Sequence, residues 1–216
     1  MTERLPRPDT ALIAETSPRR SDILVISAGD LLVRIHTLGG PHPVSWNEFR
    51  AWGPTRSRFD HHTLPRGLQD RRVAYLTRGR DAFTTALAEY FQSNSGGVSP
   101  INVSARRTAV TVIQPTRAVR LLNLDSGWVT RAGGNQAIRS GSRAMARRWA
   151  QEIHRHHDVD GVAYSSSVWG PGRCIALWER AESAMPAAPT AHRLLDDPAI
   201  IDAVSAAALA LGTFIV

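Results

Sequence analysis

The sequence contains no lysine, so its 26 Lys and Arg side chains are all arginines. Against 19 Asp and Glu they give a net charge of +7, and the pI is near 11.0. Clustered cations can neutralise phosphates, which raises the question of nucleic-acid binding. The complete absence of lysine indicates a compositional bias instead, and no helix-turn-helix, zinc-finger or aromatic RNA-binding pattern is present. We therefore treat nucleic acid as a secondary alternative.

The sequence contains one cysteine, Cys174. It cannot form an internal disulfide, and we expect the protein to work in a reducing cytoplasm.

Residues 1–20 lack the apolar stretch of an export signal. Residues 199–216 are apolar but interrupted by polar residues and glycine, so we expect no membrane span. A glycine-rich dinucleotide fingerprint and a Gly-x-Ser-x-Gly elbow are also missing, which argues against a Rossmann oxidoreductase and a serine hydrolase.

The apolar residues that are present predict an α+β fold. The chain has 216 residues, 43% of them hydrophobic, and can bury a substantial core. Short apolar runs predict strands at 31–35, 72–76, 109–113, 118–124, 161–165 and 173–178. Helical spacing and caps predict helices over about 81–92, 142–156 and 198–211. Because strands and helices do not alternate regularly, we expect a mainly antiparallel sheet with a few flanking helices.

Several short motifs, spread in order along the chain, resemble those of the RES domain, a bacterial family named for its Arg, Glu and Ser. They are Arg34, Ser57-Arg58-Phe59-Asp60, Val73-Ala74-Tyr75-Leu76, Ala86-Leu87-Ala88-Glu89 and the segment from Asp160 to Ser166. The resemblance implies an ADP-ribosyltransferase-like fold and cleavage of the nicotinamide bond of NAD, with NAD as substrate. It also implies the toxin of a toxin-antitoxin pair, with an Xre-type antitoxin as partner.

The resemblance divides the chain into three parts. We expect a polar N-terminal arm over residues 1–28, loosely ordered at its start, and a RES-like catalytic domain over 29–185. A C-terminal helical extension over 186–216 lies outside the resemblance. Between the first two expected strands, residues 37–69 are rich in Gly, Pro, His and Arg and predict a long irregular connection.

The resemblance also assigns the site. Cleavage builds positive charge on the ribose, which the carboxylate of Glu89 would stabilise. Arg58 and Arg34 would hold phosphate or ribose, since a guanidinium can donate two parallel hydrogen bonds. Tyr75 would pack on nicotinamide, and Ser166 would orient the substrate, with Ser165 and Ser167 as alternatives. Taken alone, each residue also has an ordinary reading as a solvated charge, a core aromatic or a turn serine.

The sequence leaves several alternatives open. The acceptor of ADP-ribose could be water, phosphate or a protein side chain, so hydrolase and transferase both fit, and the oligomeric state is open. The alternatives to an NAD-consuming enzyme are a basic nucleic-acid-binding or ribonuclease-like toxin and an inactive RES-fold binding protein. His154 and His157 have metal-ligand spacing on a helix. Cationic side chains also suit a helix C-terminus, so we predict no metal.

Overall fold

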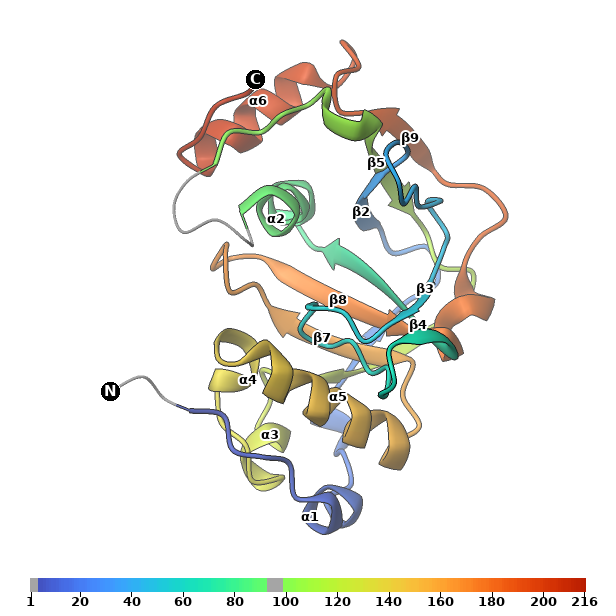
Figure 1. Ribbon diagram of the computed structural model, residues 1–216, viewed down its shortest axis with the longest axis vertical. Coiled ribbons are helices and arrows are strands. Elements are labelled where there is room, and N and C mark those ends of the chain that lie inside the picture. The colour runs from blue at the N-terminus through green and yellow to red at the C-terminus, as the bar shows by residue number, and fades with distance from the viewer. Residues whose placement is uncertain (1–3, 93–98) are drawn as a thin grey trace.

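The computed structural model describes residues 4–92 and 99–216. In this part of the chain nine strands form one sheet, in the order β1-β6-β7-β8-β4-β2-β5-β9, with β3 paired to β4 (Figure 1). The strands are β1 (Ile23–Ile26), β2 (Leu32–Thr37), β3 (Arg50–Gly53), β4 (Gly67–Arg78), β5 (Thr108–Ile113), β6 (Val119–Asn123), β7 (Gly161–Ser165), β8 (Arg173–Trp178) and β9 (Ala191–Leu194). The pair β6–β7 is parallel and the other pairs are antiparallel. The predicted α+β fold with a mainly antiparallel sheet is confirmed.

Short helices flank this sheet. The α-helices are α1 (Thr10–Glu15), α2 (Ala82–Leu87), α3 (Trp128–Arg131), α4 (Ala137–Ser140), α5 (Arg143–His156) and α6 (Ile201–Ala210). A π-helical turn, η2 (Ala88–Gln92), continues α2, and 3₁₀ turns are found at η1 (Arg20–Asp22), η3 (Ala105–Arg107) and η4 (Glu179–Ala184). Among the described residues, no helix has the length and apolar character needed to cross a bilayer.

The helices gather into two groups, which Figure 1 shows at opposite ends of the molecule. Near β7 and β8, helices α3, α4 and α5 bury Trp128, Trp149 and Trp178 in one apolar cluster. Near β2 and β5, helices α2 and α6 bury Leu87 and Val204 in a second cluster. Burying large apolar side chains is the main favourable term in folding, so each group fastens its own half of the sheet.

The two halves of the sheet are joined at a short seam between β2 and β4. These strands pair at two positions only, Leu32 with Arg78 and Val33 with Thr77. Beyond the seam, β2 continues along β5 while β4 continues along β8. The two strands therefore diverge. Residues 34–37 of β2 and the residues of β4 before Thr77 border the space between the two halves, which we call the wedge.

The N-terminal segment differs from the expected polar, loosely ordered arm. Its described residues carry α1, η1 and strand β1, which pairs with β6 at the edge of the sheet. Leu5 and Ile13 are buried against the tryptophan cluster. The sequence does not predict these elements, because two isolated apolar side chains and one four-residue strand give little periodic signal. Residues 1–3 lie outside the described part.

Two further strands were not anticipated. Strand β3 lies inside the segment predicted as an irregular connection, and β9 lies inside the predicted helical extension. Both have mixed, half-exposed sequences, which carry no alternation of apolar and polar residues. The division into arm, catalytic domain and extension stays a prediction, although both flanking segments add a strand to the one sheet.

Gly161, in the Asp-Gly motif at the start of β7, has a packing reason to be glycine. A Cβ atom there would lie 2.1 Å from the carbonyl oxygen of Ala176 on the neighbouring strand β8. We predict that Gly161→Ala lowers the free energy of unfolding by about 2 kcal/mol or more, because the strands would have to separate. Gly170→Ala is the matched control, since its Cβ would meet no atom within 4 Å. Urea unfolding measures both, and equal stability of the two variants would contradict this packing.

Candidate active site

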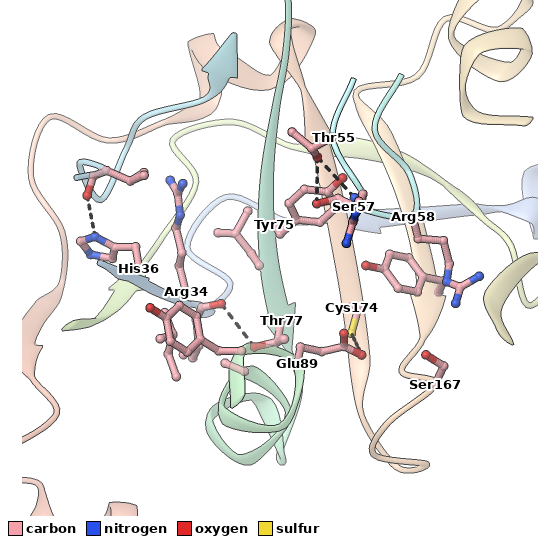
Figure 2. A pocket seen from close by; sticks show the side chains of 18 of the residues that line it. Arg34, His36, Thr55, Ser57, Arg58, Tyr75, Thr77, Glu89, Ser167 and Cys174 are labelled. Atoms are coloured by element: carbon pink, nitrogen blue, oxygen red, sulfur yellow. Dashed lines mark hydrogen bonds between the residues drawn. The ribbon is translucent and has the colours of Figure 1, made fainter. Parts of the chain in front are cut away.

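A cavity of about 480 Å³ occupies the wedge between β2 and β4 (Figure 2). Four of the predicted site residues line it: Arg34, Arg58, Tyr75 and Glu89. They come from β2, the β3–β4 connection, β4 and the π-helical turn. Residues that are distant in the sequence therefore meet at one hollow, as expected of a site for a small ligand.

Glu89 is held at its carboxylate by a serine. The Ser166 hydroxyl donates to Glu89 Oε1 at 2.6 Å and accepts from the backbone amides of Val168 and Trp169 at 3.1 and 2.9 Å. The Cys174 thiol lies 3.6 Å from the same oxygen, an interaction drawn in Figure 2. These contacts fix the carboxylate without neutralising it, since neither donor carries a positive charge.

The three consecutive serines have different surroundings. Ser165 donates to Asp125 at 2.8 Å, Ser166 donates to Glu89, and Ser167 lines the cavity. Ser166 is buried and does not line the cavity itself. Its hydroxyl therefore acts on the site through the carboxylate of Glu89, while Ser167 is the serine with direct access to a ligand.

Local backbone geometry directs Glu89 toward the cavity. The predicted helix over 81–92 is an α-helix only through Leu87, and Glu89 lies in the π-helical turn that follows. A π turn inserts an extra residue per turn and changes the direction of the following side chains, and such turns are frequent at functional sites. The spacing of apolar residues contains no signal for this change.

The cavity is rich in positive charge. Arg34, Arg56, Arg58 and Arg143 line it, and Glu89 is the one carboxylate among the described residues of its wall. Burial lowers the pKa of Arg58, and the neighbouring charge of Arg143 lowers it further. Two neighbouring guanidinium groups repel each other, and an anion bound between them would relieve this repulsion.

Both predicted arginines also anchor the chain around the cavity. Arg34, which is 7% exposed, donates to the carbonyl oxygens of Trp46 and Glu48, each at 2.8 Å. Burial lowers its pKa to about 10, so it stays charged at neutral pH. Arg58 donates to the carbonyl oxygen of Gly141 at 2.7 Å, next to the start of α5. Each guanidinium has five N–H donors, so these contacts leave others for a ligand.

Tyr75 offers an unused polar group. Its hydroxyl is buried and has no well-formed hydrogen bond within the described structure, although Ser57 is near enough to lower its pKa. Burial raises the pKa of Tyr75, and the negative charge of Asp60 adds to the shift. A buried hydroxyl without a partner costs free energy, which a ligand in the cavity could recover by accepting its proton. Tyr164 adds a second aromatic ring, packed 4.4 Å from Phe59 between ring centroids.

Several cavity residues were missed from the sequence: His36, Tyr90, Arg143, Tyr164 and Cys174. Burial lowers the pKa of His36 to about 4, so its ring is neutral. Burial raises the pKa of the Cys174 thiol, and the nearby Glu89 carboxylate raises it further, so the thiol stays protonated. Tyr164 and Cys174 lie in strands that the sequence predicts, but they face each other only through the register of β7 and β8, which the sequence does not give.

The fold matches that of a known structure. A chain of the crystal structure of the M. tuberculosis MbcT–MbcA toxin-antitoxin complex superposes with a TM-score of 0.56 at 14% identity. The match covers 92% of this chain and 98% of that chain. This likeness shows a shared fold. The model of the RES domain family matches residues 31–197, so the chain belongs to the RES domain family, as its motifs predicted. No curated protein matches the chain.

Proposed function

We propose that this RES domain protein cleaves the bond between nicotinamide and ribose in NAD, and that it acts as the toxin of a toxin-antitoxin pair. The observation that carries the proposal is the Glu89 carboxylate, fixed by Ser166 in a cavity whose other charged walls are arginines. A dinucleotide with a cationic ring and an anionic diphosphate has the charges complementary to this arrangement. Family membership and a structural relative from a toxin-antitoxin complex support the same reading.

The reaction follows from the placement of charge. As the bond from ribose C1′ to the nicotinamide nitrogen breaks, its electron pair leaves with nicotinamide and positive charge develops on the sugar. The fixed carboxylate of Glu89 stabilises that charge, and it does so most in the transition state. The acceptor oxygen then bonds to C1′ and loses its proton to solvent. With water as acceptor the products are nicotinamide, ADP-ribose and one proton.

The other residues bind and orient. Arg58 and Arg34 hold the diphosphate or ribose through N–H groups that their backbone contacts leave available. The ring of Tyr75 packs on nicotinamide and its hydroxyl donates to the substrate. Ser166 is a positioning residue, since it reaches Glu89 and does not line the cavity. We place the reaction in the cytoplasm, where an antitoxin would have to cover the cavity.

The structure gives less support to nucleic-acid binding than to cleavage of NAD. Many arginines outside the cavity pair with carboxylates, including Arg50–Asp60, Arg117–Asp160, Arg131–Asp22 and Arg139–Asp125. Arginines used in this way are less available to a phosphate backbone, and the net charge alone does not define a binding face.

Two substitutions separate transition-state stabilisation from substrate binding. Glu89→Gln keeps the size of the side chain and removes its charge, so we expect turnover to fall on the order of a hundred-fold or more with little change in NAD affinity. Arg58→Ala removes contacts that ground state and transition state share, so NAD binding should weaken by about 1.5 to 3 kcal/mol. Steady-state kinetics and calorimetric titration with NAD measure the two effects.

The control is Arg148→Ala, because Arg148 is exposed on α5 and does not line the cavity. It should leave turnover and affinity unchanged. Circular dichroism establishes that each variant is folded. A folded Glu89→Gln protein that consumes NAD at the unmodified rate would refute the role of Glu89.

The toxin role has its own test. Expression of the unmodified chain in bacteria should arrest growth and lower cellular NAD, because an unrestrained enzyme would drain the pool. Cells that express Glu89→Gln to the same level should grow normally. Unimpaired growth and unchanged NAD with the unmodified chain, at verified expression, would count against the toxin role.

A further inference from the structure

A second group of chemically active side chains lies outside the cavity, where three segments of the chain meet. His61 belongs to the connection between β3 and β4, His154 to the last turn of α5, and Glu179 to the first residue of η4 after β8. His61 Nε2 lies 2.8 Å from Glu179 Oε2, and His154 Nε2 lies 2.5 Å from Glu179 Oε1. The three possible ligand atoms all lie within 4.8 Å of one another.

We propose that His61, His154 and Glu179 form a binding site for a divalent transition-metal ion, with zinc as the best fit. Two imidazole nitrogens and one carboxylate oxygen are a donor set that zinc takes in proteins, with water in the fourth position. Calcium and magnesium prefer oxygen ligands throughout, so the two histidines argue against them. The site is independent of the proposed reaction with NAD.

The distances fit a metal after a small adjustment. Ligand atoms at about 2.0 to 2.2 Å from a tetrahedral ion are about 3.3 Å apart. The separations of 2.5 and 2.8 Å therefore need to open by several tenths of an ångström. Rotation of the Glu179 side chain, which is 25% exposed, can provide this. The same exposure leaves one side of the group open to water.

The two imidazole rings are already held by packing. The His61 ring lies 4.5 Å from the His154 ring and 5.1 Å from the Trp178 ring, between centroids. His154 also meets Trp178 edge-on at 5.3 Å. In the metal-free structure Nε2 of each ring donates to the Glu179 carboxylate, so each nitrogen must give up its proton to coordinate a metal. His61 Nδ1 is buried without a hydrogen bond and can carry the ring proton once Nε2 binds the ion.

Two nearby arginines favour a transition metal, which binds imidazole nitrogen, over a hard ion such as calcium or magnesium. Arg71 donates to the carbonyl oxygen of His61 at 2.6 Å, and Arg180 donates to that of His154 at 2.8 Å. These guanidinium groups fasten the backbone that carries both histidines, and they repel cations at longer range. An ion that bonds covalently to neutral imidazole tolerates this repulsion better than a hard ion does.

A bound ion would fasten the segment that carries part of the cavity wall. His61 follows Arg58 by three residues, and the metal would tie it to α5 and to η4. Asp60 already anchors this segment by accepting from Thr55 and Arg50, and it also contacts His62. The metal would thus add a second anchor next to the first.

The test compares metal binding by the full chain and two variants. The purified protein is stripped with a chelator, incubated with zinc, passed through a desalting column and assayed for zinc content and melting temperature. We expect about one zinc per chain and a higher melting temperature with zinc, because a metal that binds only the folded state stabilises it. His154→Gln should lose both effects, since its amide can still donate to Glu179 but ligates zinc poorly.

His156→Gln is the matched control. His156 lies two residues away on the same helix, 3.5 Å from Glu152, and is not part of the group. It should bind zinc as the unmodified chain does. No zinc in the unmodified chain, or equal zinc in all three proteins, would overturn the proposal and leave a hydrogen-bonded cluster.

A spectroscopic measurement covers the case in which His154→Gln fails to fold. Cobalt replaces zinc in such sites and absorbs visible light strongly when four-coordinate, so the stripped, unmodified chain with cobalt should develop intense visible bands that zinc abolishes. Only the weak absorption of hydrated cobalt in that sample would overturn the proposal equally.

Discussion

The short pairing between β2 and β4 is the constraint on which the site depends. If these strands had paired along their full length, the sheet would be continuous and no wedge would open. Two paired positions hold the halves together, and the divergence beyond them exposes side chains of both strands to one cavity. Each half has its own helical cluster, and a third apolar cluster, which includes Leu32 of β2 and Leu76 of β4, spans both halves.

Charge burial is the second constraint around the wedge. A buried guanidinium or carboxylate is costly unless hydrogen bonds satisfy it. Arg34 meets two backbone carbonyls, and Asp60 meets Thr55 and Arg50. The Arg34 contacts fix the connection between β2 and β3, and the Asp60 contacts fix the connection between β3 and β4. Glu89 differs, since it is held by the neutral hydroxyl of Ser166 and keeps its charge available to a ligand. The structure therefore separates charges that support the fold from the charge that faces the cavity.

The sequence could predict the longer elements and the motifs but not their meeting point. The sequence predicts β4, β7 and β8 from their apolar runs and α5 from its helical stripe. Strands β3 and β9 are not predicted because they are short and of mixed polarity, and β1 is not predicted because four residues, although apolar, give little periodic signal. Arg34, Arg58, Tyr75 and Glu89 were selected by their motifs, while Arg143 was passed over. Its position depends on how α5 lies against the wedge, which no local pattern encodes. The same is true of His61 and Glu179, which are 118 positions apart.

The central claim is that this cavity breaks the nicotinamide bond of NAD, and mass analysis of the products tests it most directly. The purified chain is incubated with NAD, in buffers with and without phosphate, and small molecules and protein are both analysed by mass. The account predicts release of nicotinamide with matching formation of ADP-ribose, its phosphate ester or an ADP-ribosylated protein. Intact NAD and no free nicotinamide, after prolonged incubation with protein shown to be folded, would contradict it.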